Sequence, residues 1–338
     1  MDGSLEAFVA ALGLGRVRAW TRLSGGVSGH VWRVELERGA ICVKRALAKL
    51  DVADDWRAPV GRCLYEYRWF ETARGVVPGS APRPLAVDAD RGFLAMEFLP
   101  PEDFPLWKAK LLSGRVDIAD ARAVGARLGA IHAATAGRRE IAERFASDDC
   151  FHALRLEPYL LATAARRPGV AAPLRALVEH TAKTRLALVH GDVSPKNILL
   201  GPGGPVFLDA ETAWWGDPAF DLAFCLNHLL LKALVVPGAA EPLAASFAAL
   251  ARAHLARVNW EPAEALEARA AALLPGLMLA RIDGKSPVEY LTAENQKDFV
   301  RAFAEPRLLH PPASLRAVAD AWHAALRADK SRLEEAQP

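Results

Sequence analysis

The sequence predicts an α+β protein of two lobes: a small antiparallel β-sheet with one main helix, followed by a larger, mostly helical part. The chain has 338 residues, which is long for a single hydrophobic core and short for three. Its character changes near residue 98, where strand-like alternation gives way to segments rich in alanine and leucine. We therefore expect an N-lobe over residues 1–97, a helical C-lobe over 98–330 and a polar tail over 331–338.

Strand patterns dominate the first hundred residues. Residues 31–36 alternate between apolar and polar side chains, and residues 41–44 resume the pattern after the turn at Arg38-Gly39. This arrangement predicts a β-hairpin, with a further strand before it. The other elements expected in this lobe are a helix over 60–74 and strands over 84–87 and 93–98.

Helical patterns dominate the remainder. Val124, Leu128 and Ile131 recur at the spacing of one helix face. Alanine and leucine are strong helix formers, and they predict helices over 150–164, 172–185, 219–234, 240–257, 263–279 and 313–328. Only the segment 186–210 interrupts this region with strand character.

Bulk properties limit the class of protein. Hydrophobic residues make up 52% and charged residues 24% of a chain with a net charge of +2, which indicates a globular protein that does not bind nucleic acid. The N-terminus carries Asp2 and Glu6 rather than a basic stretch, so it does not resemble a signal peptide. The longest apolar stretch contains Asn227, His228 and Lys232, which predicts a buried helix rather than a membrane span. We expect a soluble, cytoplasmic protein. The oligomeric state stays open, with a homodimer as one alternative.

The four cysteines are scattered and form no CxxC pair. This spacing favours buried, reduced thiols over a disulfide framework or a metal site.

The most informative segment runs from His190 to Asn197 and is followed by Leu208-Asp209-Ala210-Glu211. It places an acid, an amide and a second acid in two short loops between strand-like residues. Phosphoryl transfer from ATP needs one carboxylate to orient the attacking hydroxyl and oxygen ligands to hold magnesium. Asn197 follows Asp192 by five positions and Asp209 follows it by 17, spacings that suit a catalytic loop, a hairpin and a metal loop.

These residues receive separate roles. Asp192 is the candidate that orients the acceptor hydroxyl and takes its proton. Asn197 and Asp209 are the candidates for magnesium, which prefers hard oxygen ligands. Glu211 lies two residues beyond Asp209 and is either a further metal ligand or a surface acid.

Lys44, at the end of the hairpin, is a candidate for binding the α- and β-phosphates of ATP. Such a lysine needs an acidic partner, and Glu66 on the following helix is the first choice, with Glu71 as the second. A glycine-rich turn precedes this strand and contains Gly25, Gly26 and Ser28. Glycines allow backbone N–H groups to approach phosphates, although the turn matches neither common nucleotide-binding pattern.

Two further segments complete the expected site. Backbone groups around Glu97 and Leu99, where the sheet gives way to helices, are candidates for pairing with adenine. Asp217 and Pro218 are typical of a helix start, and we expect Asp221 to bind backbone N–H groups of the catalytic loop. Trp214 and Trp215 either stack on a substrate ring or pack between helices.

Together these motifs resemble the protein-kinase-like fold in its small-molecule branch, which includes aminoglycoside phosphotransferases, choline kinases and 5-methylthioribose kinases. The sequence departs from protein kinases at Gly191 and Ser194 and carries Asp209-Ala210-Glu211 in place of Asp-Phe-Gly. The stretch DAETAWWGDPAFDLAF is most similar to the methylthioribose kinases, and a fainter similarity around Arg281 implies basic contacts to the substrate.

The resulting hypothesis is a two-lobed phosphotransferase that uses ATP and Mg²⁺ to phosphorylate a hydroxyl of a small molecule. Asp221 follows Asp209 by only 12 positions, which leaves no room for the activation segment of a protein kinase. The acceptor pocket is expected near Ser194, Trp214, Trp215 and Arg281. A sugar-like acceptor is preferred, an aminoglycoside is the alternative, and a pseudokinase that only binds nucleotide is a third reading.

Overall fold

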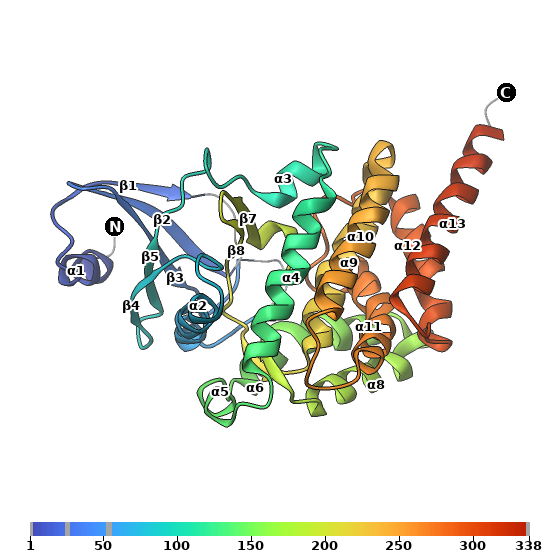
Figure 1. The fold of residues 1–338 in the computed structure, drawn as a ribbon, viewed down its shortest axis with the longest axis horizontal. Helices are drawn as coiled ribbons and strands as arrows, with labels where there is room; N and C mark the ends of the chain where they lie inside the picture. The colour runs from blue at the N-terminus through green and yellow to red at the C-terminus, as the bar shows by residue number, and fades with distance from the viewer. Residues whose placement is uncertain (1–2, 24–27, 52–55, 336–338) are drawn as a thin grey trace.

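The computed structural model describes residues 3–23, 28–51 and 56–335. It confirms the predicted α+β fold of two lobes, a five-stranded antiparallel sheet with its helix beside a larger helical lobe (Figure 1). The sheet and α2 lie at one end of the molecule, and the last helix, α13, lies at the other end.

The N-lobe sheet has the strand order β1-β2-β3-β5-β4. Its elements are α1 (Gly3–Ala11), β1 (Val17–Leu23), β2 (Gly29–Leu36), β3 (Ala40–Ala46), η1 (Val60–Arg62), α2 (Cys63–Val76), β4 (Pro84–Asp88) and β5 (Phe93–Glu97). The predicted hairpin is confirmed as β2 and β3, which pair antiparallel with Val31 opposite Lys44. The predicted helix and the last two strands are also present.

Helix α2 joins the sheet to the C-lobe. Trp69 and Phe70 on this helix are fully buried. The Trp69 ring lies 4.7 Å from the ring centre of His190 and 6.0 Å from that of Phe207, both in the C-lobe. One hydrophobic core therefore continues from the N-lobe into the helical lobe. A second, smaller core forms between α1 and the outer part of the sheet around Leu5, Val34 and Phe93.

Helices α4, α9, α10 and α11 form the centre of the C-lobe (Figure 1). Its helices are α3 (Trp107–Leu112), α4 (Ile118–Thr135), α5 (Arg139–Arg144), α6 (Asp148–Phe151), η2 (His152–Leu161), α7 (Ala162–Arg166), η3 (Pro168–Val170), α8 (Ala171–Lys183), η4 (Pro195–Asn197), α9 (Pro218–Val235), η5 (Pro237–Ala239), α10 (Ala240–Leu255), α11 (Ala263–Asp283), α12 (Glu294–Leu309) and α13 (Leu315–Glu335). By length and composition α9 could cross a membrane, but 89% of it is buried inside the protein, as expected of a core helix.

The motif segment forms two small two-stranded sheets against these helices. Strand β6 (Ala187–Val189) pairs with β9 (Trp214–Gly216), and β7 (Ile198–Gly201) pairs with β8 (Gly204–Phe207). These pairs place the catalytic loop between β6 and β7 and the metal loop between β8 and β9.

The structure also differs from the predicted elements in several places. Helices α1, α3, α5 and α12 were not predicted. The expected helix over 150–164 is three consecutive pieces, and the middle one, η2, has a π-type hydrogen-bond pattern. Pro158 lies inside η2 and has no N–H to donate, which explains the altered pattern. Helix α13 continues to Glu335, beyond the predicted end at residue 328. All four cysteines are buried and unpaired, as predicted.

Candidate active site

The catalytic loop is fixed by Asp221 on helix α9. The Asp221 carboxylate accepts hydrogen bonds from the backbone N–H groups of His190 at 2.7 Å and Gly191 at 2.8 Å, which confirms the predicted support. The start of α9 is also as predicted, because the Asp217 side chain accepts from the Ala219 N–H at 3.0 Å and Pro218 occupies the first turn. The rigid helix therefore sets the position of the loop.

His190 holds the backbone of the loop in a defined shape. Its Nε2 lies 3.1 Å from the Leu208 carbonyl oxygen and its Nδ1 lies 3.1 Å from the Asp192 N–H. Nε2 must therefore donate and Nδ1 must accept, which is the neutral form of the ring. Burial lowers the pKa of His190, although Asp221 opposes the shift, and this agrees with a neutral ring.

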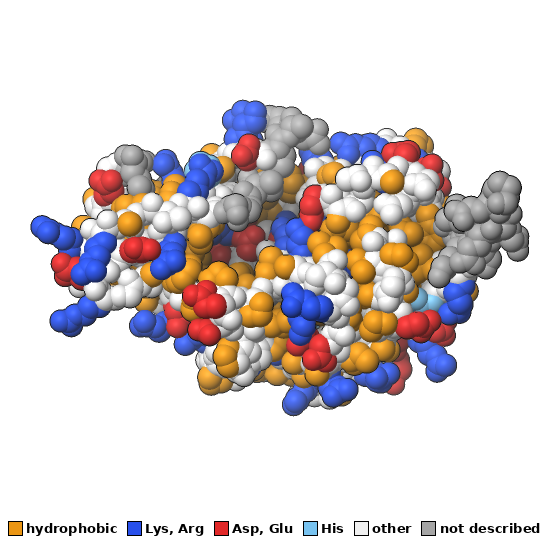
Figure 2. All heavy atoms as spheres, turned by 90° about the horizontal axis from the view of Figure 1, so that it is seen from above, with side chains coloured by type: hydrophobic (Ala, Val, Ile, Leu, Met, Phe, Trp, Pro, Cys, Tyr) orange, Lys and Arg blue, Asp and Glu red, His pale blue; other side chains and the backbone are white. Residues whose placement is uncertain are grey.

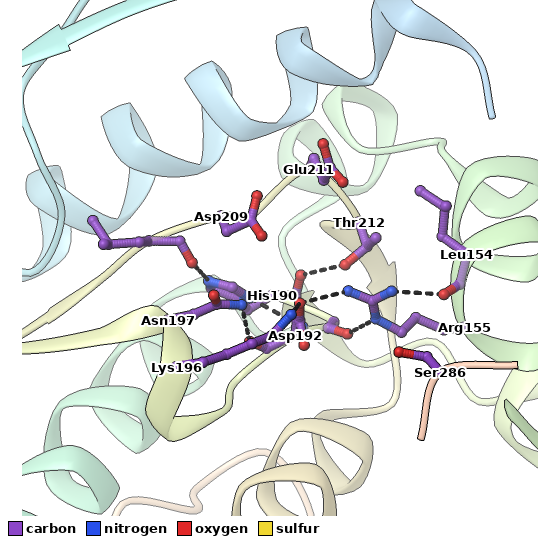
Figure 3. A network of polar contacts seen from close by, with 12 residues as sticks. Leu154, Arg155, His190, Asp192, Lys196, Asn197, Asp209, Glu211, Thr212 and Ser286 are labelled. Atoms are coloured by element: carbon purple, nitrogen blue, oxygen red, sulfur yellow. Dashed lines mark hydrogen bonds and ion pairs between the residues drawn. The ribbon is translucent and has the colours of Figure 1, made fainter. Parts of the chain in front are cut away.

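One oxygen of Asp192 is held and the other is unpaired. Its Oδ2 lies 2.9 Å from Arg155 and 3.3 Å from Lys196 (Figure 3). Its Oδ1 is buried and has no hydrogen-bond partner among the described residues. A buried carboxylate oxygen without a donor is unusual, and it is the atom that could accept a hydrogen bond from a bound hydroxyl.

Arg155 is itself locked in place. It donates to the carbonyl oxygens of Gly191 and Leu154 in addition to its contact with Asp192. Burial lowers the pKa of Arg155, but the neighbouring acidic groups, Asp192 first and then Tyr159, Glu211 and Asp209, together outweigh that effect and raise it. The guanidinium therefore stays charged and fixes the orientation of Asp192.

Asn197 lies beside Asp192 at the other end of the loop. Its Nδ2 donates to the Asp192 carbonyl oxygen at 3.1 Å, which leaves its amide oxygen directed elsewhere. In Figure 3 Asn197, Asp192 and Asp209 lie around one region. Asp192 and Asp209 both raise the pKa of Lys196 against the lowering effect of burial, so both acids act on the same ammonium group.

Lys44, in strand β3 of the N-lobe, contacts the metal loop of the C-lobe. Its Nζ forms ion pairs with Glu66 at 2.8 Å, with Asp209, and with Glu211 at 3.4 Å. The predicted pairing of Lys44 with Glu66 is therefore present, whereas the runner-up Glu71 pairs with Arg144.

The three carboxylates around Lys44 affect one another. Burial lowers the pKa of Lys44, but its acidic neighbours outweigh this and raise it well above its ordinary value. Burial raises the pKa of Glu66 to about 7, and the nearby acids Asp209 and Glu211 add to the shift while Lys44 opposes it. Burial would raise the pKa of Asp209, but Lys44 and Lys196 hold it below its ordinary value. Asp209 is therefore ionised at neutral pH.

Glu211 connects the metal loop to Arg62 in η1. The Arg62 Nε donates to Glu211 at 3.0 Å, and the same guanidinium donates to the carbonyl oxygens of Ser28 and Leu47. Glu211 is 4% exposed, so it is not the surface acid that the sequence left open. Asp209 has a φ of 63°, the one left-handed non-glycine residue in the described chain. Such strain costs ~1–3 kcal/mol and tends to occur at functional sites.

The remaining nucleotide-side residues lie as follows. Gly25 and Gly26 fall outside the described residues, while Ser28 adjoins β2 and is held by Arg62. Glu97 ends β5, and its N–H donates to the Arg83 carbonyl oxygen at 2.9 Å. Leu99 follows in the connection between the lobes and is half-buried.

The predicted acceptor residues divide into two groups. Trp214 is 1% exposed and stacks on Phe151 at 4.1 Å, so it packs in the core, and Trp215 is 9% exposed in the same strand, β9. The packing alternative therefore describes both tryptophans in this structure. Ser194 is buried in the catalytic loop with an unpaired Oγ, and Arg281 is buried beside Tyr159. These two stay candidates for the acceptor site.

Three residues that hold Asp192 and Glu211 were not expected from the sequence: Arg155, Lys196 and Arg62. Lys196 lies within the motif, four positions after Asp192, and could have been noticed there. Arg155 and Arg62 come from distant segments. For Arg155 the only local indication is a charged residue in the otherwise apolar stretch Ala153 to Leu156.

The oxygen ligands present fit a magnesium ion. Carboxylate oxygens of Glu66, Asp209 and Glu211 lie within 4.8 Å of one another. Together with the amide oxygen of Asn197 they form a set of hard donors, the type that Mg²⁺ prefers. The cation of Lys44 neutralises part of their charge in the structure.

Between the two lobes the surface is hollowed, and acidic and basic side chains lie next to each other in the hollow (Figure 2). The site therefore combines a bound, ionised Asp209, a buried lysine–glutamate pair and a carboxylate with one free oxygen. These are the parts of a phosphoryl-transfer site.

Comparison with known proteins agrees with this class. Residues 19–260 match the phosphotransferase enzyme family, and the chain belongs to that family. This membership confirms the enzyme class predicted from the motif, a small-molecule phosphotransferase. A curated relative, the methylthioribose kinase of Erwinia tasmaniensis strain DSM 17950, is 35% identical over 75 residues, which is 22% of this chain and 19% of the relative's length.

Solved structures share the fold. The amicoumacin kinase hAmiN, in complex with AMP-PNP, Ca²⁺ and Ami, has a TM-score of 0.61 and 16% identity over 93% of this chain and 96% of its own. A choline/ethanolamine kinase family protein from Mesorhizobium loti has a TM-score of 0.52 and 17% identity over 96% and 99% of the two chains. At these identities the similarity is one of fold.

Proposed function

We propose that this protein transfers the γ-phosphate of ATP, with Mg²⁺, to a hydroxyl group of a small, sugar-like molecule. One observation carries the proposal. The N-lobe pair Lys44–Glu66 meets Asp209 of the metal loop within a few ångströms, while Asp192 presents a free carboxylate oxygen from the adjoining catalytic loop.

The nucleotide would lie between the lobes. Lys44 would bind phosphate oxygens, for which it is suited because Glu66 holds it in position and because its pKa keeps it charged. The Glu97 carbonyl and the Leu99 N–H are the backbone groups proposed to pair with adenine, since the Glu97 N–H is already bonded to Arg83.

Asp209 and Asn197 would hold Mg²⁺, with Glu211 as a third candidate. A bound Mg²⁺ neutralises charge on the phosphates and fixes their orientation. The contact of Glu211 with Arg62 links this metal loop to the chain at Ser28, beside the predicted phosphate-binding turn.

Asp192 would position the acceptor hydroxyl and take its proton. Arg155 and Lys196 hold Oδ2, so Oδ1 faces the acceptor as the free hydrogen-bond acceptor. General-base help of this kind contributes ~10²–10⁴-fold to a rate. The rest of the catalysis would come from positioning and charge neutralisation.

A sugar-like acceptor is favoured by the short match to methylthioribose kinase. A protein acceptor is disfavoured, because only 11 residues separate Asp209 from Asp221 and β9 already occupies part of that interval. Use of ATP and four unpaired thiols fit a cytoplasmic location.

The substitution Asp192→Asn tests the proposal. It keeps the shape of the side chain, and Arg155 stays anchored by two carbonyl oxygens. We expect turnover of any accepted substrate to fall ~10²–10⁴-fold with little change in the dissociation constant for AMP-PNP and Mg²⁺. Asp117→Asn, at the exposed N-cap of α4, is the matched control and should leave both unchanged. Equal behaviour of wild type and Asp192→Asn with every acceptor would instead support a nucleotide-binding pseudokinase.

A further inference from the structure

A cluster of buried polar side chains lies in the C-lobe near Asp192, and of its members only Arg281 has been considered above, as a candidate for the acceptor site. Its members are Tyr159 in η2, His228 and Lys232 in α9, Arg281 in α11, and Ser286 and Tyr290 in the segment that follows α11. Arg281 is 5% exposed, His228 4% and Lys232 1%. Burying charged groups to this extent costs free energy unless a partner of opposite charge or a hydrogen bond compensates. The burial of this cluster therefore needs a physical reason.

Tyr159 connects the cluster to the catalytic loop. The guanidinium of Arg281 lies 5.4 Å from the centre of the Tyr159 ring, and that of Arg155 lies 5.6 Å from it. Arg155 is the residue that holds Asp192. The cluster therefore begins one side chain away from the catalytic carboxylate.

The cations of the cluster have no acidic partner in the described structure. Arg281 donates to two neutral groups, the Tyr159 hydroxyl at 2.9 Å and the Ser286 hydroxyl at 3.1 Å. Lys232 lies 4.3 Å above the ring centre of Tyr290, and no ion pair joins it to a described carboxylate. Glu289, the carboxylate that raises the pKa of Lys232, already pairs with Lys108 at 2.5 Å.

Several polar atoms at this site are also left without partners. The Nε of Arg281 and the Nε2 of His228 are buried and unpaired, while the His228 Nδ1 lies 3.0 Å from the Tyr290 hydroxyl. The Oγ of Ser194, in the catalytic loop, is unpaired in the same way. Buried polar atoms are nearly always hydrogen-bonded, so these atoms indicate a site completed by a ligand.

We propose that the acceptor carries an anionic group, a carboxylate or a phosphate ester, which Arg281 and Lys232 bind while a hydroxyl of the same molecule reaches Asp192. The inference rests on the proposed function, since it assigns the acceptor to the same site. Arg281 supplies a planar set of donors suited to either anion, and Lys232 supplies a point charge. A polycation such as an aminoglycoside would meet like charges here and is disfavoured.

Binding of four related sugars tests the proposal. D-glucuronate, D-glucose 6-phosphate, D-glucose and D-glucosamine share a ring with hydroxyl groups and differ in charge. Each is titrated calorimetrically into the protein saturated with AMP-PNP and Mg²⁺, so that the nucleotide phosphate site is filled. We expect at least one anionic sugar to bind ten times more tightly than glucose and glucosamine. The preferred member of the anionic pair distinguishes a carboxylate from a phosphate ester.

The double substitution Arg281→Met with Lys232→Met should abolish that preference. Methionine keeps the length and the apolar stem of each side chain, and the Lys232→Met single variant serves if the double variant does not fold. Arg307→Met is the matched control, because Arg307 also lies over an aromatic ring, that of Phe303, on helix α12, and is not a member of the cluster. It should leave the preference intact.

The outcomes separate the two proposals. The inference is overturned if the four sugars show no difference in binding, if glucosamine is preferred, or if the preference survives the double substitution. If anionic sugars bind selectively but no acceptor is phosphorylated, the anion site stands and the proposed function fails. If phosphate is transferred to a neutral or cationic acceptor without any anion preference, the proposed function stands and the anion site fails.

Discussion

Two buried lysines in this molecule have pKa values that are shifted in opposite directions. Lys44 is surrounded by three carboxylates, and they raise its pKa well above the ordinary value in spite of burial. Lys232 is equally buried but has no paired carboxylate, and burial lowers its pKa from 10.5 to about 7, with Glu289 opposing the shift and Lys108 and Arg281 adding to it. The first lysine is held charged, whereas the second is destabilising whenever it is protonated.

This difference predicts a pH-dependent gain in stability for Lys232→Met. When the pKa of a lysine is lower in the folded than in the unfolded protein, the unfolded chain binds the proton more tightly. The free energy of unfolding therefore falls as the pH falls from the unfolded pKa to the folded pKa. For Lys232 that loss develops between pH 10.5 and about 7. The other titratable or charged groups around it are His228, Cys225, Tyr290, Arg281 and the Lys108–Glu289 pair, and the substitution leaves them in place.

We therefore expect thermal unfolding of Lys232→Met at a midpoint roughly 5 °C above wild type at pH 6.5 and less than half of that at pH 9.5. Differential scanning calorimetry at the two pH values measures it, with Arg307→Met as the control for loss of a cation over a ring. A variant less stable than wild type at both pH values would mean that Lys232 supports the fold, and would weaken the anion site.

At the scale of elements, the packing of α4 against α10 depends on glycine. A Cβ atom at Gly125 would lie 2.2 Å from the carbonyl oxygen of Leu250, and one at Gly129 would lie 2.9 Å from that of His254. The two helices therefore approach to backbone contact along this seam. Helix α4 also carries His132, whose Nε2 lies 3.1 Å from Asp221, the residue that holds the catalytic loop.

Gly125→Ala should accordingly destabilise the protein, by ~1–3 kcal/mol as for overpacked sites. The matched control is Gly75→Ala in the exposed part of α2, where a Cβ meets nothing within 4 Å. There the loss of chain flexibility in the unfolded state should stabilise by ~0.5–1 kcal/mol. Urea unfolding of both variants measures the effects. Equal stability of the two would show that α4 and α10 can separate without cost.

The elements also show which parts of the site could be read from the sequence. Asp192, Asn197 and Asp209 lie within 18 consecutive residues, so their local spacing was sufficient to predict that they converge. The pairing of Lys44 with Glu66 was also predicted correctly, because Glu66 lies on the helix that directly follows the strand of Lys44. The buried cluster could not be predicted, because η2, α9 and α11 are brought together only by tertiary packing.

Local composition explains the missed elements. Helix α12 (Glu294–Leu309) is rich in charged residues and contains Pro306, so its apolar face is hard to recognise. Helices α3 and α5 have only six residues each. Trp214 illustrates the limit on side chains, because nothing in the local sequence distinguishes a ring that stacks on a substrate from one that stacks on Phe151.

At the scale of the whole molecule, the two lobes share one core. It runs from Leu94 and Trp69 in the N-lobe through Phe207 to the helices of the C-lobe. Ion pairs cross the same boundary, since Lys44 and Arg62 of the N-lobe contact Asp209 and Glu211 of the metal loop. These contacts indicate that the lobes are stabilised together, whereas the second core around Leu5 and Val34 belongs to the outer sheet alone.

Substitution of one tryptophan in each core tests this coupling. Trp69→Ala removes a fully buried ring at the junction and should cost ~3–5 kcal/mol, lowering the midpoint by about 10 °C, with both lobes still unfolding in a single calorimetric transition. Turnover should fall as well, because the ring packs against His190, which bonds the Asp192 N–H. Trp20→Ala, in the half-buried outer sheet, should cost less and leave turnover nearly unchanged, since among the described residues Trp20 packs on the second core and not on the shared one. Two resolved transitions in the wild type, or equal effects of the two substitutions on turnover, would mean that the lobes fold independently and that the site does not depend on their shared core.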